Sequence, residues 1–273
     1  MKELSPDEKR EAVRKNYAQV AERGASSCGC SPASSCCGST TEDLDRVSEL
    51  IGYSKDELKD IPEGANMGLG CGNPHAIAAL KPGEAVLDLG SGGGFDSFLA
   101  ARQVGDSGRV IGVDMTSEMV HKARANARKG GFQNVDFRLG EIENLPVADG
   151  IIDVILSNCV INLSPDKARV YQETYRVLKP GGRISVSDVV AIAPLPGHIK
   201  NDIALLSGCV AGAATVAEIE QMLDDAGFEN IHVSPKEESR ELVNQWQPDS
   251  NIGDYVLSAT IEATKPISTE ESS

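Results

Sequence analysis

Apolar and polar positions follow two periods along the chain, and the change of period marks the elements. From Glu84 onward, short apolar runs alternate with stretches whose apolar residues recur every three to four positions. We expect strands at 84–89, 109–114, 134–138, 151–157 and 182–190, with helices at 95–103, 117–129 and 165–178. This alternation is typical of a doubly wound α/β fold with a mostly parallel sheet.

Two regions flank this alternating core. Before it, Ser5-Pro6-Asp7-Glu8 begins a helix that runs to about Arg23, and short helices follow at 42–51 and 55–60. Residues 24–40 are small, polar and rich in cysteine, so we expect a mobile segment there.

After Pro196 the pattern predicts helices at 199–208 and 216–226, then strands at 229–234 and 254–262 that pair antiparallel as a hairpin and close the sheet. The predicted organisation is an N-terminal helical and cysteine-rich extension (1–62), a Rossmann-like core (63–194), a C-terminal segment with the closing strands (195–264) and a disordered tail (265–273).

The charge of the chain limits the classes of partner that we expect. The sequence has 26 basic and 41 acidic residues and a net charge of −15, so its surface repels polyanions and we expect no nucleic-acid partner. The N-terminus is charged from its second residue and no apolar run has membrane-spanning length, so we expect a cytoplasmic protein without a membrane partner. In a reducing compartment the seven cysteines would persist as thiols, which suits soft-metal binding or redox chemistry.

A glycine-rich loop lies between the first predicted strand and its helix. Val86-Leu87-Asp88-Leu89-Gly90-Ser91-Gly92-Gly93-Gly94 lets a ligand approach the backbone and the free N–H groups at the start of the helix. Twenty residues after Gly94, Asp114 ends the second strand, where its carboxylate can accept hydrogen bonds from ribose hydroxyls. The dinucleotide fingerprint requires glycine at position 95, which is Phe95, so NAD is disfavoured.

This loop resembles that of the class I methyltransferases, in which an acid-x-Gly-x-Gly-x-Gly sequence surrounds S-adenosylmethionine. The resemblance implies a seven-stranded sheet in which Asp114 holds the ribose, Met115 stacks on adenine, Glu141 and Ile142 meet the adenine edge, and Asn158 faces the methionyl end. Ordinary core packing stays an alternative for Met115 and Ile142. The implied cofactor residues are Asp88, Gly90, Ser91, Gly92, Gly94, Asp114, Met115, Thr116, Glu141, Ile142 and Asn158.

Three cysteines suggest the methyl acceptor. Cys159 follows the fourth strand, Cys71 lies in a glycine-rich loop before the sheet, and Cys209 lies after the fifth strand. A single cysteine here would be ordinary core packing, but three can converge at the carboxyl edge of the sheet. Three thiolates suit a soft, pyramidal ion with a lone pair, whereas zinc would want a fourth ligand.

Five segments resemble the arsenite methyltransferases, and the resemblance runs from about Cys36 to Phe228. They are Asn66-Met67-Gly68-Leu69-Gly70-Cys71-Gly72-Asn73-Pro74, Val113-Asp114-Met115-Thr116, Ser157-Asn158-Cys159-Val160-Ile161-Asn162-Leu163, Leu178-Lys179-Pro180-Gly181-Gly182-Arg183 and Cys209-Val210-Ala211-Gly212-Ala213. The resemblance implies that Cys71, Cys159 and Cys209 bind As(III).

The N-terminal cysteines match a second feature of that family. Cys36-Cys37 has the context of a cysteine that exchanges disulfides with the loop cysteine, and either of the two could be the partner. For Cys28 and Cys30, a zinc site and a tail without function stay open as alternatives.

The function expected from the resemblance is methyl transfer from S-adenosylmethionine to As(III), as arsenite and then methylated arsenite, in arsenic detoxification. A thiol reductant, thioredoxin or glutathione, would restore the cysteines. The alternatives are a class I methyltransferase for a small organic acceptor such as a quinone, and a thiol protein that sequesters metalloid without turnover.

Overall fold

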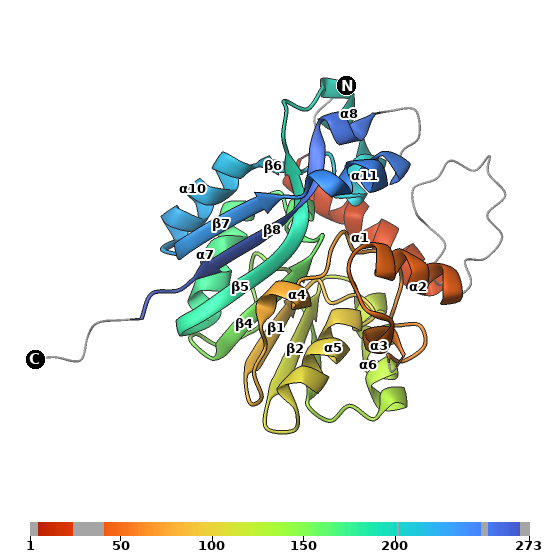
Figure 1. The fold of residues 1–273 in the computed structure, drawn as a ribbon, viewed down its shortest axis with the longest axis vertical. Helices are drawn as coiled ribbons and strands as arrows, with labels where there is room; N and C mark the ends of the chain where they lie inside the picture. The colour runs from red at the N-terminus through yellow and green to blue at the C-terminus, as the bar shows by residue number, and fades with distance from the viewer. Residues whose placement is uncertain (1–4, 24–40, 60, 201, 247–250, 268–273) are drawn as a thin grey trace, which may run out of the picture.

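One twisted sheet forms the centre of the protein in the computed structural model, which describes residues 5–23, 41–59, 61–200, 202–246 and 251–267 (Figure 1). Its strands lie in the order β3-β2-β1-β4-β5-β8-β7, and a two-residue strand, β6, pairs with β5. The strands are β1 (Ala85–Leu89), β2 (Arg109–Asp114), β3 (Val135–Leu139), β4 (Ile152–Asn158), β5 (Leu178–Ala191), β6 (Ala214–Thr215), β7 (Glu229–Pro235) and β8 (Val256–Thr264).

Strands β1 to β5 are parallel, whereas β8 runs antiparallel to both β5 and β7. The predicted fold class, a mostly parallel sheet with antiparallel C-terminal strands, is therefore confirmed. The helices are α1 (Pro6–Arg23), α2 (Thr41–Leu50), α3 (Lys55–Leu58), α4 (His75–Ala78), α5 (Phe95–Val104), α6 (Ser117–Gly130), α7 (Lys167–Val177), α8 (Gly197–Lys200), α9 (Ile203–Ser207), α10 (Val216–Ala226) and α11 (Arg240–Trp246), with 3₁₀ turns η1 (Ile161–Leu163), η2 (Glu237–Ser239) and η3 (Ile252–Asp254).

The C-terminal region differs from the prediction in two places. The helix predicted at 199–208 is broken, because the Asp202 side chain accepts hydrogen bonds from the N–H groups of Ala204 and Leu205 and so begins α9 separately from α8. The two last strands pair as expected, but the connection between them contains α11. It is therefore not a tight hairpin.

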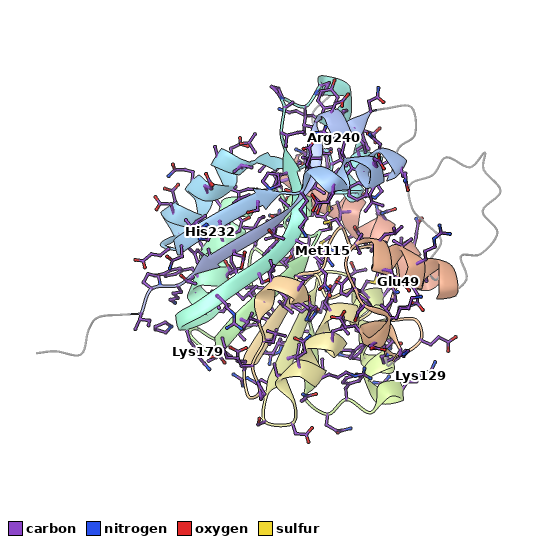
Figure 2. The ribbon with its side chains drawn as sticks, in the orientation of Figure 1. Glu49, Met115, Lys129, Lys179, His232 and Arg240 are labelled. Atoms are coloured by element: carbon purple, nitrogen blue, oxygen red, sulfur yellow. A yellow bond between two sulfur atoms is a disulfide. The ribbon has the colours of Figure 1, made fainter. Side chains whose placement is uncertain are left out.

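The sheet brings the ends of three strands to one edge. Leu89 of β1 pairs with Val113 of β2 and with Ser157 of β4, so the loops that follow these strands begin side by side. Helix α1 contacts α6 and α9. Met115, which directly follows β2, is half-buried and lies near the centre of the view in Figure 2, whereas Lys129 and Lys179 lie toward its periphery.

No described helix is long and apolar enough to cross a membrane.

Candidate functional site

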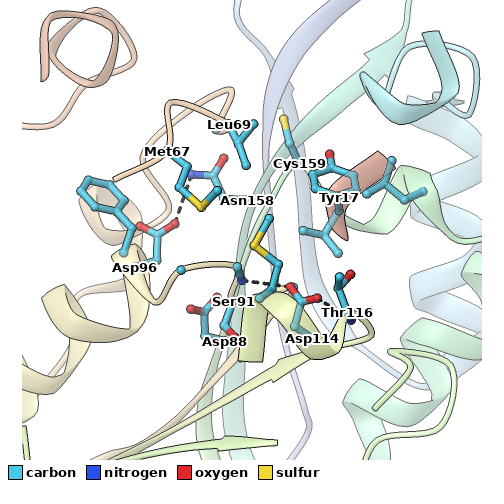
Figure 3. A pocket seen from close by; sticks show the side chains of 18 of the residues that line it. Tyr17, Met67, Leu69, Asp88, Ser91, Asp96, Asp114, Thr116, Asn158 and Cys159 are labelled. Atoms are coloured by element: carbon cyan, nitrogen blue, oxygen red, sulfur yellow. Dashed lines mark hydrogen bonds between the residues drawn. The ribbon is translucent and has the colours of Figure 1, made fainter. Parts of the chain in front are cut away.

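A cavity opens at the carboxyl edge of β1, β2 and β4 (Figure 3). Most residues that the sequence predicted at the cofactor line it, namely Asp88, Gly90, Ser91, Gly92, Asp114, Met115, Thr116, Ile142 and Asn158. The cavity therefore gathers, from separate loops, the residues that the sequence placed around one ligand.

Two predicted cofactor residues do not line this cavity. Gly94 precedes α5, and a Cβ atom there would collide with the rings of Phe98 and Phe137, so its role is close packing. The Glu141 carboxylate instead lies 2.8 Å from the Arg14 guanidinium of α1. In this structure Glu141 anchors α1.

The backbone of the glycine loop leaves room for a ligand. Gly90 and Gly92 have φ angles of +65° and +50°, which side chains rarely adopt. A Cβ atom at Gly90 would collide with Val160, whereas one at Gly92 would meet nothing within 4 Å. The buried Ser91 hydroxyl has no hydrogen-bond partner among the described residues. An unsatisfied hydroxyl beside an open loop fits a polar ligand.

The cavity is acidic. Asp114 accepts hydrogen bonds from the N–H groups of Gly92 (3.0 Å) and Thr116 (2.8 Å), which hold its carboxylate in place. Burial raises the pKa of Asp114, and burial, followed by the charge of Asp96, raises that of Asp88 well above its usual range. A ligand with positive charge would relieve this repulsion, so the cavity fits the cationic sulfonium and ammonium groups of S-adenosylmethionine.

Asn158 connects this cavity to the loop that carries Cys71. Its amide oxygen accepts from the Cys71 N–H at 3.1 Å, and its amide nitrogen donates to the Gly72 carbonyl at 2.8 Å. The same nitrogen lies 3.0 Å from the Tyr53 hydroxyl, which donates to Asp96 at 2.6 Å. Tyr53 and Asp96 were not among the residues predicted from the sequence. The position of Asp96, at the start of the helix that follows the glycine loop, was the available signal.

The three predicted cysteines converge beside the cavity. Cys159 lines it and forms a disulfide with Cys71, whose Cα atom is 5.9 Å away. The Cys209 thiol lies 2.8 Å from the Cys159 carbonyl oxygen, and all three side chains are buried. The expectation that all seven cysteines are thiols is wrong for Cys71 and Cys159, because their loops bring the two sulfurs within bonding distance. The remaining cysteines, at 28, 30, 36 and 37, lie outside the described residues.

Two of the three cysteines beside the cavity have an uncommon backbone conformation. Cys159 and Cys209 have φ angles of +55° and +65°, a region that costs a residue with a side chain about 1–2 kcal/mol. Such conformations persist where the surrounding structure holds them, and they gather at functional sites. Here Asp188 holds the turn after Cys159 by accepting from the N–H groups of Ile161 (3.0 Å) and Asn162 (3.3 Å).

Asp188 lies close to two of the three cysteines, Cys71 and Cys159. A carboxylate oxygen of Asp188 and the sulfurs of Cys71 and Cys159 all lie within 4.8 Å of one another. Burial raises the pKa of Asp188 to about 6, and burial together with the charge of Asp188 raises the pKa of Cys209 well above its usual range. Cys209 is therefore a neutral thiol when no acceptor is bound.

Comparison with known proteins agrees with this geometry. A sequence profile described as "Methyltransferase domain" matches residues 80–227. The chain is 53% identical over 266 residues to an arsenite methyltransferase of Halobacterium salinarum, an alignment that covers 96% of this chain and 68% of that protein. The chain belongs to the arsenite methyltransferase family. The predicted family and the predicted methyltransferase class are thus confirmed.

Other arsenite methyltransferases match parts of the chain. One from Aquipseudomonas alcaligenes is 44% identical over 190 residues, which cover 67% of this chain and 54% of that protein. A crystal structure of an arsenic(III) S-adenosylmethionine methyltransferase from Chlamydomonas reinhardtii superposes with a TM-score of 0.61 at 32% identity. That match covers 84% of this chain and 75% of the algal chain. In the sequence alignment, the chain spans only about half of the length of the Aquipseudomonas protein.

Proposed function

We propose that this chain transfers the methyl group of S-adenosylmethionine to trivalent arsenic, first in arsenite and then in methylated arsenite. The observation that carries the proposal is the convergence of Cys71 and Cys209 on Cys159, which lines an acidic, glycine-lined cavity. Three soft ligands suit a pyramidal As(III) ion, and they come from three separate segments. An organic acceptor would give no reason for this convergence.

The cavity residues bind and orient the cofactor, which supplies an electrophilic methyl group on a positively charged sulfur. In this proposal Asp114 accepts hydrogen bonds from the ribose, while Met115 and Ile142 contact the adenine. The backbone of the glycine loop lies along the methionyl part, and the carboxylates of Asp88 and Asp96 offset its positive charge.

The cysteines hold arsenic as the substrate. Three thiols replace the three hydroxyl groups of arsenite, each thiol proton leaves with a hydroxyl group as water, and three As–S bonds form. Because each thiol proton leaves in the water that forms, Cys209 can bind arsenic even though burial and the charge of Asp188 keep it a neutral thiol in the free protein. The arsenic lone pair is the nucleophile, so methyl transfer requires positioning and no general base.

Methyl transfer raises arsenic formally to the pentavalent state. Two cysteine thiolates return it to the trivalent state by giving up two electrons, and they become a disulfide. Cys71 and Cys159, which are joined in the structure, are suited to this step. A thiol reductant, thioredoxin or glutathione, then supplies two electrons to reopen the bond. We propose that Cys36 or Cys37 relays them by disulfide exchange.

Incubating the purified chain with arsenite, S-adenosylmethionine labelled in its methyl group and glutathione tests this function. Labelled methylarsenic species should form in amounts that depend on arsenite and on the thiol. The absence of labelled arsenic, with the cofactor shown to bind, would contradict the proposal and favour an organic acceptor.

A further inference from the structure

Tyr17 of α1 lies between the two halves of the site. Its side chain lines the cavity, as do Asp114 and Cys159 (Figure 3). The ring packs against the buried cluster that contains Cys159 and Cys209 and also against the cluster that contains Met67 and Met119. One aromatic ring, from a helix far away in sequence, thus contacts both the cofactor side and the cysteine side.

The hydroxyl of Tyr17 is bonded to the segment that carries Cys209. It donates to the Ser207 carbonyl at 3.0 Å, across 190 residues of sequence. Ser207 is the last residue of α9, where carbonyl groups lack partners within the helix, and Cys209 follows two residues later in the left-handed region. Because burial raises the pKa of Tyr17 well above its usual range, the hydroxyl keeps its proton and stays a donor.

We propose that Tyr17 is a positioning residue for methyl transfer. Its hydroxyl holds the Ser207–Cys209 turn so that the Cys209 sulfur faces Cys159, and its ring forms the wall between the cofactor and the thiols. Nothing else in the described part of α1 is hydrogen-bonded to α9. The role of Tyr17 in catalysis rests on the proposed function, whereas its hold on the Cys209 turn does not.

Tyr17→Phe removes the hydroxyl and keeps the ring, so it distinguishes their two roles. We expect the kcat for arsenite methylation to fall about tenfold, since one buried hydrogen bond that orients a ligand is lost. The cofactor dissociation constant should change less than about twofold, because the ring that lines the cavity remains. Tyr255→Phe is the matched control, since Tyr255 packs against the same buried cluster that contains Cys159 and Cys209 but does not line the cavity. It should leave kcat unchanged.

A second readout does not depend on activity. With Cys28, Cys30, Cys36 and Cys37 replaced by serine and the Cys71–Cys159 disulfide intact, Cys209 is the only free thiol. Its alkylation by iodoacetamide should be at least about fivefold faster in Tyr17→Phe than in the parent or in Tyr255→Phe, because the Ser207–Cys209 turn opens more often.

Two results would overturn the positioning role. One is an unchanged alkylation rate and an unchanged kcat in Tyr17→Phe. The other is a loss of activity that merely follows a lower melting temperature or weaker cofactor binding. If the parent protein does not methylate arsenite but Tyr17→Phe still exposes Cys209, the proposed function fails and the structural hold of Tyr17 stands.

Discussion

The thiol of Cys209 lies 2.8 Å from the carbonyl oxygen of Cys159, although 50 residues separate the two in the chain. The contact joins two turns whose central residues have left-handed backbones, one at the end of β4 and one after α9. The disulfide from Cys159 to Cys71 adds the loop before the sheet. Three segments that share no local pattern therefore meet beside one cavity.

Removing the carboxylate of Asp114 should weaken cofactor binding and leave As(III) binding intact. Asp114→Ala removes the acceptor that Gly92 and Thr116 hold in place, and the loss of charge-assisted hydrogen bonds should cost about 1.5–3 kcal/mol, or roughly 10- to 150-fold in dissociation constant. Calorimetric titration with the cofactor measures this change. Asp136→Ala, at an exposed position of β3, is the control. Equal affinities of the two variants for the cofactor would show that Asp114 does not bind it.

A side chain at Gly90 should disrupt the glycine loop. Gly90→Ala combines a φ of +65° with a collision between the new methyl group and Val160, whereas Gly131→Ala combines a similar φ of +73° with open space. Gly131→Ala should cost about 1–2 kcal/mol of stability without affecting cofactor binding. Gly90→Ala should cost more stability and weaken cofactor binding at least about tenfold. The double variant Gly90→Ala/Val160→Ala should recover part of the loss, and no recovery would count against the collision.

Stability should carry a pH-dependent contribution from Asp188. Burial raises its pKa from 3.8 to about 6, so the folded chain binds this proton more tightly than the unfolded chain. The contribution is present below about pH 4 and is lost as the pH rises through about 6. Asp188→Asn removes that loss. The difference in unfolding free energy between variant and parent should therefore shift in favour of the variant by about 2–3 kcal/mol between pH 4 and pH 7.

Urea unfolding of both proteins at the two pH values, with the disulfide intact, measures the Asp188 contribution. The amide of the variant presents an N–H group where Asp188 accepts hydrogen bonds, so a loss of stability that does not depend on pH should add to the pH-dependent shift. A difference in unfolding free energy that does not change with pH would show that Asp188 titrates normally.

Replacing Cys36 and Cys37 together by serine should affect turnover more than As(III) binding. Disulfide exchange can deliver electrons to the Cys71–Cys159 pair without either cysteine being an arsenic ligand. Stoichiometric As(III) binding and the multiple-turnover rate are measured separately, with Cys28→Ser/Cys30→Ser as the control. Normal turnover with release of trivalent product would contradict the redox role.

The sequence predicted the parts of the site that depend on local pattern. The glycine loop, Asp114 and the cysteine motifs each lie at the end of a strand or in a short run whose backbone chemistry is readable without the fold. The alternation of strand and helix predicted a mostly parallel sheet, whereas the order of its strands, β3-β2-β1-β4-β5-β8-β7, depends on how the helices pack and was not predicted.

Other parts depend on contacts across the fold, and no period in the sequence encodes them. Tyr17 looks like one apolar position of an amphipathic helix until α1 is placed against α9. Glu141 has the position of a cofactor residue but pairs with Arg14, because α1 lies above it. The Cys71–Cys159 bond depends on the distance between two loops, which the sequence does not give.

If three thiolates hold arsenic, the three cysteines should not be equivalent. Cys159→Ser and Cys209→Ser should each abolish methylation of arsenite, because each removes a soft ligand. Cys71→Ser should retain part of the activity on a monomethylated trivalent substrate, which has two exchangeable positions and can be held by two thiolates.

An assay of each single variant with arsenite and with monomethylarsenite, under reducing conditions, tests the three-thiolate site. Cys159→Ser and Cys209→Ser should give no product from either substrate, and Cys71→Ser should give product from monomethylarsenite alone. Near-normal methylation of arsenite by Cys159→Ser or by Cys209→Ser would contradict it.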